Sequence, residues 1–510
     1  MKIIIIGAGI GGLFTGAFLA KEGYEVTVLE KNAIIGGGLQ CFTRKGEMFE
    51  TGMHILGGFQ PGGSLSKICH YLGILGKLRI MPTDSDAIDT ITYQSDGKTY
   101  RIPRGREAFV RYFATEFPDE ADNIRRYTDA MYALTQEVDL FYIRRGENSI
   151  MGHSEEFSIA ADEFIRRYIT NPRLRDILAY MNPMYGGIAG HTPAYIHSLI
   201  NILYIEGSSQ FVGGSQQLAD ALRDVITQAG GQVIAGDGVV QIVTEERRVT
   251  KVITKKGREY TADWYIAGIH PCTMLTMMDE TAFTKAYRTR LQEIRNFFSS
   301  FSVYIKFKPA TQPYVNHPRY YQHEDGAVWR LAEYDDATWP KGFMYITPPT
   351  EENATANGKP SYASRMIVNC IMSFDVVRKW EDTTVGHRGT DYEAWKERLK
   401  QRILQKLEEL HPGFCDTIDF SFASSPLTIR DYYGTKDGSL YGFQRDCQNI
   451  LFSQIPVGTK VSNLLLTGQN INLHGICGVP LTSIEVAEAF VGSGTVIDKI
   501  NEAYKTFSAE

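Results

Sequence analysis

The fold of this chain is decided by its first thirty residues, Met1–Glu30, MKIIIIGAGIGGLFTGAFLAKEGYEVTVLE. Within this stretch, Lys2–Ile6 is an apolar run rich in β-branched residues, which predicts a strand buried on both faces. Helix-forming and small residues over Leu13–Lys21 predict a helix that packs closely against its neighbours. A second strand is predicted over Glu25–Leu29, and it ends at the acidic residue Glu30. These segments together predict a β–α–β unit.

Three glycines, Gly7, Gly9 and Gly12, follow the first strand with the spacing G-x-G-x-x-G. Gly7 permits a tight turn, Gly9 lets a pyrophosphate approach the backbone, and Gly12 lets the helix lie close to the sheet. The helix N-terminus presents unpaired N–H groups and a partial positive charge to phosphates. Glu30, eighteen residues beyond Gly12, is placed to accept hydrogen bonds from an adenosine ribose. The unit therefore predicts a dinucleotide-binding site.

Two other interpretations, a membrane span and a signal peptide, fit part of this stretch. Ile3–Ala20 carries no charge over eighteen residues, which reaches the lower length of a membrane span. Behind Lys2 it also has the pattern of a signal peptide. Five glycines in the run argue against both, and its removal would separate Glu30 from the strand that its unit requires. We therefore favour the dinucleotide site.

Length and composition restrict the class of protein. At 510 residues the chain exceeds one ordinary core, so two domains or one domain with a large insertion are expected. Hydrophobic residues at 43% and charged residues at 22% are typical of a soluble globular protein. A net charge of −6 gives no reason to expect nucleic acid. Seven scattered cysteines without a C-x-x-C motif predict a reduced, cytoplasmic protein without disulfides or zinc.

The segments that follow the β–α–β unit carry a family resemblance. LEKNAIIGGG at 29–38 and GEMFETGMHILGG at 46–58 resemble the FAD-dependent phytoene desaturase family, within the flavin amine oxidase superfamily. The most similar branch contains the carotenoid isomerases and the all-trans-retinol 13,14-reductases (retinol saturases). Many relatives in the superfamily have an arginine after the glycine doublet, where this chain has Gly38. The departure resembles the isomerase and saturase branch and counts against an amine oxidase.

The resemblance implies an α/β protein with a discontinuous Rossmann-type FAD-binding domain and an inserted α+β substrate domain. The FAD-binding domain would comprise residues 1–80, 205–270 and 445–510, and the substrate domain 81–204 and 271–444. The resemblance covers nearly the whole chain. It is strongest at the two termini.

Sequence patterns predict the elements between the termini. Thr90–Pro103 alternates around Asp96-Gly97 and predicts a hairpin, and the chain from Arg106 to about Tyr204 is predicted to be mostly helical. Helices are also predicted for QQLADALRDVITQAG at 216–230 and for Asp391–Leu410. Further strands are predicted over Gln232–Val243, Val249–Thr254, Glu259–Ile266, Phe301–Phe307, Tyr320–Ala332, Phe343–Ile346 and Met366–Phe374.

Two later segments also resemble the family. The first, Phe420–Asp446, contains SSPLT and GSLYG, and by the resemblance its strand would face the substrate side of the flavin. Without the resemblance, its tyrosines are aromatics of a sheet and its turns. In Asn463–Gly492 an apolar strand leads into Gly468, and a helix is predicted from about Thr482. The resemblance implies that this helix points its N-terminus at the flavin pyrimidine, where positive charge would stabilise the anionic reduced cofactor.

These patterns name the candidate site residues. We expect no metal site, and no catalytic residue is identified beyond the weak candidate His54, for which a histidine satisfied by backbone groups is the alternative. His474 is a weaker candidate, and a covalent flavin at Cys477 is disfavoured. The motifs and the resemblance place these residues at the cofactor: Gly7, Gly9, Gly12, Glu30, Lys31, Gly37, Gly38, Leu39, His54, Val239, Gly468, Gly478 and Leu481.

The predicted function is redox chemistry on C–C or C=C bonds of an apolar, isoprenoid or polyene-like molecule, with hydride transfer through flavin N5. The sequence does not decide whether the reaction is desaturation, saturation or isomerisation. We also expect NAD(P)H or another electron partner and a peripheral contact with a membrane. A flavin amine oxidase is one alternative. A prenyl-binding protein of the GDP-dissociation-inhibitor type, without redox activity, is the other, and the intact glycines and Glu30 argue against it.

Overall fold

The computed structural model describes residues 1–146, 152–356 and 359–509. Its first unit comprises β1 (Lys2–Ile6), α1 (Ile10–Lys21) and β2 (Glu25–Leu29), and both strands have the predicted bounds. α1 begins three residues earlier than predicted, since Gly9 serves as its N-cap. Ile3 and Ile5 of β1 pack in one core, and Ile4 and Ile6 pack in another. The strand is therefore buried on both faces, as its composition predicted.

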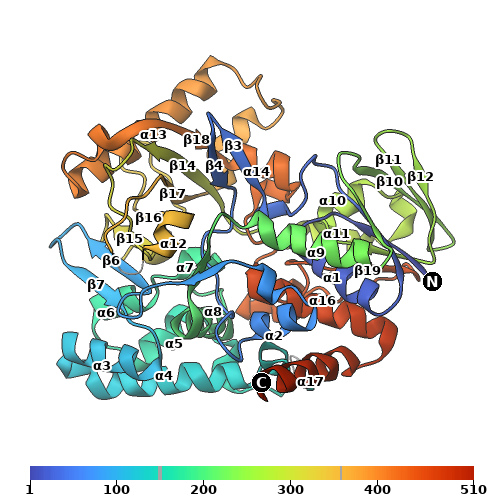
Figure 1. The fold of residues 1–510 in the computed structure, drawn as a ribbon, viewed down its shortest axis with the longest axis horizontal. Coiled ribbons are helices and arrows are strands. Elements are labelled where there is room, and N and C mark those ends of the chain that lie inside the picture. The colour runs from blue at the N-terminus through green and yellow to red at the C-terminus, as the bar shows by residue number, and fades with distance from the viewer. Residues whose placement is uncertain (147–151, 357–358, 510) are drawn as a thin grey trace.

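β1 lies at the centre of a five-stranded parallel sheet with the order β19-β13-β1-β2-β9. The three added strands are β9 (Gln232–Ile234), β13 (Trp264–Ala267) and β19 (Leu464–Leu466). α1, α9 (Gln216–Gln228) and α16 (Gly475–Val491) pack together beside it, at the right of Figure 1. All five strands fall within residues 1–80, 205–270 and 445–510, and the division into domains stays a prediction.

A second sheet of seven strands has the order β18-β14-β17-β16-β15-β6-β7, and β15–β6 is its one parallel pairing. α13 (Thr390–Leu410) covers one face through a core that contains Trp395 and Leu399. The strands are β6 (Asp89–Tyr93), β7 (Thr99–Ile102), β14 (Ser299–Phe307), β15 (Arg319–Gln322), β16 (Gly342–Ile346), β17 (Arg365–Met372) and β18 (Ile418–Ser424). β6 and β7 form the predicted hairpin.

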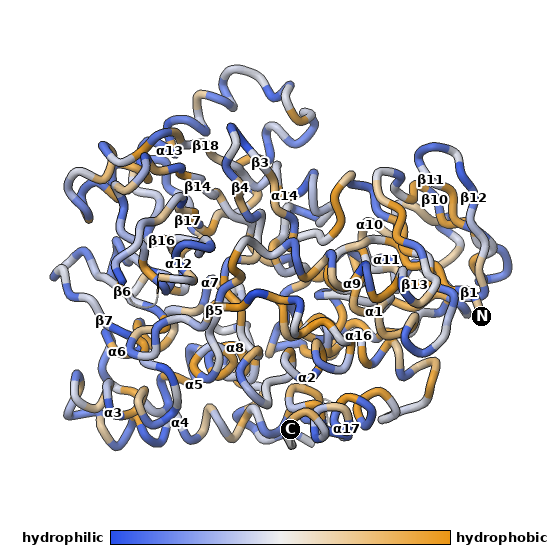
Figure 2. The backbone as a smooth tube through the Cα atoms, viewed as in Figure 1, coloured by the Kyte–Doolittle hydropathy of each residue, from blue (hydrophilic) through white to orange (hydrophobic). Residues whose placement is uncertain are grey.

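A helical lobe lies below this sheet in Figure 1. It occupies the predicted region, and the short turn Pro118–Glu120 separates its first two helices. Its helices are α3 (Arg106–Glu116), α4 (Ala121–Gln136), α5 (Ala161–Tyr168), α6 (Pro172–Leu178), α7 (Asn182–Tyr185) and α8 (Ala194–Gly207). α8 is buried along most of its length. Figure 2 shows that hydrophobic residues are concentrated in α1, α16 and the parallel sheet.

The remaining elements are short strands, a small sheet and peripheral helices. They are β3 (Cys41–Arg44), β4 (Glu47–Glu50), β5 (Ile80–Pro82), β8 (Ser209–Phe211), β10 (Val239–Glu245), β11 (Arg248–Thr254), β12 (Glu259–Tyr260), α2 (Ser64–Tyr71), α10 (Pro271–Thr276), α11 (Lys285–Glu293), α12 (Glu351–Thr355), α14 (Pro426–Tyr433), α15 (Ile450–Ser453) and α17 (Thr495–Ala509).

Three predicted strands were wrong in extent. The segment 232–243 forms β9 and β10, which belong to different sheets, because the chain turns at Gly236 with a positive φ of 72°. The segment 259–266 likewise divides into β12, which pairs with β11, and β13, which joins the parallel sheet. The segment 320–332 is extended only to Gln322, and Val328–Arg330 is a short 3₁₀ helix.

Two predictions near the carboxy terminus were also wrong. Tyr432 and Tyr433 lie on α14, whose start is fixed by a capping box at Ser425, and they are not residues of a sheet. The last glycine-rich helix begins at Gly475 rather than near Thr482. No single helix in the described ranges is long and apolar enough to cross a membrane, and only α16 with α17 passes that test as a pair, bent by 116°.

Candidate cofactor and substrate site

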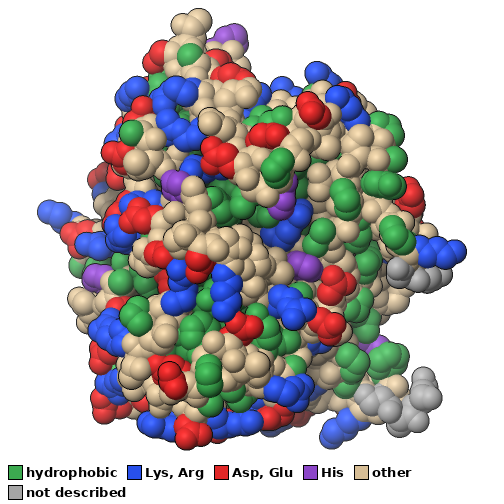
Figure 3. Space-filling model, turned by 90° about the vertical axis from the view of Figure 1, so that its left-hand side faces the viewer, with side chains coloured by type: hydrophobic (Ala, Val, Ile, Leu, Met, Phe, Trp, Pro, Cys, Tyr) green, Lys and Arg blue, Asp and Glu red, His purple; other side chains and the backbone are tan. Residues whose placement is uncertain are grey.

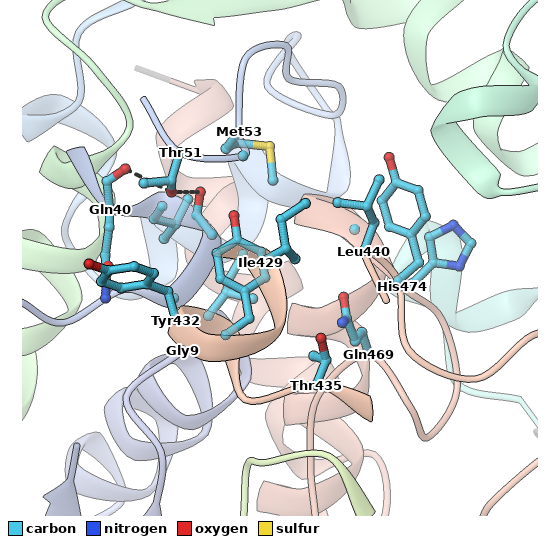
Figure 4. Close-up of a pocket in the computed structure, with 18 of the residues that line it drawn as sticks. Gly9, Gln40, Thr51, Met53, Ile429, Tyr432, Thr435, Leu440, Gln469 and His474 are labelled. Carbon is cyan, nitrogen blue, oxygen red and sulfur yellow. Dashed lines mark hydrogen bonds between the residues drawn. The ribbon is translucent and has the colours of Figure 1, made fainter. Parts of the chain in front are cut away.

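A cavity of about 830 Å³ lies beside the parallel sheet, within the size range of small-molecule and cofactor sites. Gly7, Glu30, Gly268 and Thr467 line it, and each follows the carboxyl end of one strand. This edge is where ligands bind in open α/β sheets. Figure 4 shows side chains from distant segments, among them Thr51, Tyr432 and His474, converging on the cavity.

Glu30 is held in place at the cavity wall. Its Oε2 accepts a hydrogen bond from the N–H of Ala8 and its Oε1 one from the N–H of Asn32, both at 2.8 Å. A carboxylate oxygen has further acceptor capacity, so the group remains competent to bind hydroxyls. Lys31 beside it donates to the carbonyl of Asp431 at 2.8 Å. Burial lowers the pKa of Lys31, and the nearby Glu30 and Asp431 carboxylates oppose that shift.

The second and third glycines of the first motif, Gly9 and Gly12, have different environments. A Cβ placed on Gly9 would meet nothing within 4 Å, because Gly9 borders the cavity. A Cβ on Gly12 would lie 1.9 Å from the carbonyl oxygen of Gly7. Gly9 therefore leaves room for a ligand, and Gly12 allows α1 to contact the turn after β1. Gly12 does not line the cavity.

Two helix N-termini open on this single cavity. α1 begins after Gly9 and α16 begins after His474, and neither N-cap side chain caps its helix. Gly475–Gly478, the first turn of α16, lines the cavity. The two helices pack together, and Ser483 donates a hydrogen bond to the carbonyl of Gly11 at 3.3 Å. The uncapped amides and the partial positive charges of both helices are thus available to an anionic or acceptor-rich ligand.

The phenol of Tyr433 lies against two glycines, Gly38 and Gly52, of the segments that follow β2. A Cβ on Gly38 would lie 3.4 Å from the phenol oxygen of Tyr433, and one on Gly52 only 2.2 Å from it. A Cβ would thus only contact the phenol at position 38, whereas it would overlap the phenol at position 52. Gly37, with a φ of 57°, and the buried Leu39 form the turn beside Gly38.

The histidines of the site have distinct partners. His54 is 9% exposed, lines the cavity and places Nδ1 3.4 Å from Oε2 of Glu50, which is buried. Its partner is thus a carboxylate and not a backbone group. His474 also lines the cavity, and burial, assisted by the charge of Arg445, lowers its pKa to about 3, so the ring is neutral at physiological pH. Burial raises the pKa of the Cys477 thiol to about 11.

Most of the predicted cofactor residues line the cavity. Gly12 and Leu481 stay outside it, and Leu481 is fully buried in the core. The predicted residues that line it are Gly7, Gly9, Glu30, Lys31, Gly37, Gly38, Leu39, His54, Val239, Gly468 and Gly478. The sequence did not identify Glu50 as the partner of His54, Tyr433 as the neighbour of Gly38 and Gly52, or α8 as a wall of the cavity. The all-round apolar composition of α8 was the one signal for a buried wall.

The other end of the cavity is largely apolar. α8 contributes Leu199 and Leu203, and the seven-stranded sheet contributes Met344, Ile371 and Phe422. In the described part of the chain, the charged residues on the cavity wall are Glu30, Lys31, Arg44 and Lys396. Within the same ranges no group of three or more His, Cys, Asp or Glu is arranged to hold a metal ion. Acidic and basic side chains are interspersed over the outer face shown in Figure 3.

Positive helix ends at two places on one cavity suit a cofactor that has both a pyrophosphate and an electron-accepting ring, and they define a flavin-dependent oxidoreductase. The chain belongs to the flavin containing amine oxidoreductase family, whose profile matches residues 10–489.

The chain is also similar to two curated proteins and to one solved structure. All-trans-retinol 13,14-reductase of Danio rerio is 24% identical over 94% of this chain and 84% of its own length. Prolycopene isomerase 2 of an Oncidium hybrid cultivar is 24% identical over 86% of this chain and 74% of its own. A solved oxidoreductase structure from Methanosarcina mazei has a TM-score of 0.64 at 17% identity, and the match covers 96% of this chain and all of that one. The solved structure shows a shared fold.

Proposed function

We propose that this protein is an FAD-dependent oxidoreductase that acts on C–C or C=C bonds of an isoprenoid or polyene-like substrate. The observation that carries the proposal is the continuity of one cavity from two uncapped helix N-termini to a wall of apolar side chains. The names of the curated relatives, a retinol reductase and a prolycopene isomerase, support the same substrate class.

The residues present fit FAD at three places. Glu30 would hold the adenosine ribose, the first turn of α1 the pyrophosphate, and the first turn of α16 the polar edge of the flavin ring. The open space beside Gly9 leaves room for the phosphates. When bound, the flavin would supply hydride transfer through N5.

The chain would supply orientation, exclusion of water and a proton-transfer group. The apolar side chains of α8 and the sheet would align the substrate bond and keep water out. We assign proton transfer to His54, since Glu50 orients its ring from 3.4 Å away. The proposal also includes NAD(P)H or another electron partner. It further includes contact with a membrane that delivers the apolar substrate.

The amine oxidase alternative is less well supported. A protonated amine requires a carboxylate or an aromatic cage near the flavin. Among the described residues, Glu30 is the acid on the cavity wall, and it lies at the nucleotide end. A prenyl-binding protein without redox activity would have no use for the uncapped helix ends or for Glu30.

Flavin reduction and reoxidation under anaerobic stopped flow test the proposal. Purified protein should release FAD on denaturation, and its flavin absorbance should change on mixing with members of an isoprenoid and polyene panel. Primary and secondary amines should have no effect. Gly9→Val should fold yet contain little FAD, because its side chain would enter the phosphate space.

Turnover with an amine and with no lipid would refute the substrate class. Protein that neither contains FAD nor takes it up would refute the enzyme assignment and support the prenyl-binding alternative.

A further inference from the structure

The face of the seven-stranded sheet that meets the cavity carries one polar row. Ser424 of β18, Ser302 of β14 and Asn369 of β17 are cross-strand neighbours in register, and all three line the cavity. Met344 of β16 continues the row as an apolar residue. We call Ser424, Ser302 and Asn369 the polar row.

Apolar and aromatic residues flank the polar row. Ile371 lies two residues from Asn369 on β17, and Phe422 lies two residues from Ser424 on β18. The ring of Phe422 stacks on Tyr304, with centroids 4.9 Å apart. On β14 the hydroxyl of Ser300 extends the polar row, at 3.3 Å from that of Ser302, and the neighbouring residues of β17 and β18 are apolar.

The hydrogen bonds of the polar row leave the Nδ2 group of Asn369 unused. Ser302 donates to Oδ1 of Asn369 at 2.7 Å, and the neighbouring Ser300 donates to the carbonyl of Cys370 at 3.1 Å. Within the described ranges the Nδ2 group of Asn369 has no hydrogen-bond partner. The Asn369 amide is therefore fixed by Ser302 and still has two N–H donors.

The unused amide faces the cavity. β17 is an interior strand between β14 and β16, and α13 covers one face of it. Cys370 and Met372 are fully buried on the side of α13, whereas Asn369 and Ile371 keep partial exposure and line the cavity. The phenol of Tyr304 lies beside the hydroxyls of Ser302 and Ser424. Burial raises the pKa of the Tyr304 phenol, and hydrogen bonds with these two hydroxyls partly offset the rise.

We infer that the polar row is a recognition subsite for a single acceptor oxygen, a hydroxyl or a carbonyl, on an otherwise apolar substrate. Asn369 donates to that oxygen and Ser302 holds the amide in position. A buried donor left unpaired by a pure hydrocarbon is costly, so such a site discriminates against hydrocarbons more strongly than an apolar pocket could. The inference rests on the proposed function and narrows its substrate class to oxygen-bearing isoprenoids or polyenes.

The test is equilibrium binding of matched ligands to the flavin-loaded protein, followed by quenching of intrinsic fluorescence. The probes are geranylgeraniol, geranylgeranial and the hydrocarbon with the same skeleton but no oxygen. Wild type should bind the alcohol and the aldehyde alike, and both about tenfold more tightly than the hydrocarbon. The aldehyde can only accept a hydrogen bond, so its equal binding identifies the protein as the donor.

Substitutions test whether the polar row, and not the rest of the cavity wall, causes the preference for oxygen-bearing ligands. Asn369→Leu should lose the preference for oxygen while it keeps hydrocarbon affinity, and the milder Ser302→Ala should reduce the preference by about threefold. Ser299→Ala is the matched control, since Ser299 lies on the same strand but does not line the cavity. Its preference should equal that of wild type, and FAD content shows whether each variant is folded.

The outcomes distinguish the two levels of the proposal. Equal affinity of wild type for alcohol and hydrocarbon, or an unchanged preference in both Asn369→Leu and Ser302→Ala, would overturn the subsite and leave the proposed function intact. Wild-type protein that binds none of the three probes would overturn the isoprenoid substrate class and the subsite with it.

Discussion

Gly52 and Tyr433 form a contact that a single methyl group would disturb. A Cβ at position 52 would lie 2.2 Å from the phenol oxygen and 3.4 Å from Cζ. Gly52→Ala should therefore displace the ring and cost about 1–3 kcal/mol, as overpacking typically does. Tyr433→Phe removes the oxygen and should restore most of the loss in the double variant. Thermal unfolding and FAD dissociation constants of the four proteins measure this coupling. Equal effects of Gly52→Ala in both backgrounds would contradict it.

At the residue scale, the sequence indicated what several residues do, but it did not indicate which distant residues they contact. The spacing of Gly7, Gly9 and Gly12 alone is sufficient to assign a structural role to each glycine. The role of Gly38 could not be assigned in this way, because the phenol that lies against it comes from Tyr433, almost four hundred residues away. Likewise, Ser300 and Ser302 alternate visibly in β14, but their alignment with Asn369 depends on strand register.

At the scale of elements, the hairpin of β3 and β4 packs its aromatic residues against the seven-stranded sheet, and the carboxylate of Glu47 adds ion pairs to that contact. Glu47 pairs with Lys306 of β14 and, at 3.3 Å, with Arg365 of β17, whose side chain is 4% exposed. Glu47→Gln should lower the free energy of unfolding by about 3 kcal/mol, because it leaves a buried guanidinium without an acid.

Urea unfolding checks this value against Glu280→Gln, which removes the partner of Arg288 at a carboxylate that is 84% exposed. That control should change stability by less than about 1 kcal/mol. Similar losses in both variants would show that Glu47 does not anchor the hairpin.

Elements with a strong apolar pattern could be predicted, and their ends could not. The glycines and Pro480 in the carboxy-terminal segment indicated a loop up to Thr482. In the structure they form the first turns of α16, because packing against α1 outweighs the low helix propensity of these residues. The turn at Gly236 was hidden inside an apolar run that resembles one continuous strand.

At the scale of the whole molecule, three buried histidines link stability to pH. Burial lowers the pKa of His197 to about 3, of His270 to about 4 and of His474 to about 3, from an ordinary value of 6.5. Between these values the unfolded chain binds protons that the folded chain does not, so stability falls as pH drops below about 6.5. At pH 5 each histidine should account for about 2 kcal/mol of this loss.

Urea unfolding at pH 7.5 and pH 5 measures the effect. His197→Gln should reduce the difference between the two pH values by about 2 kcal/mol, whereas the same change at the exposed His387 should leave it unaltered. An identical pH dependence in wild type and His197→Gln would count against a neutral, buried His197.

In the parallel sheet, strands that pair with each other are synthesised far apart in time. Synthesis proceeds from the amino terminus, and β1 and β2 therefore emerge first. Their neighbours β13 and β19 begin at Trp264 and Leu464, after about half and about nine-tenths of the chain. A ribosome-bound chain thus carries the apolar edge of β1 unpaired for much of its synthesis, which is a surface that chaperones bind. The cofactor cavity closes only after β19 has been synthesised.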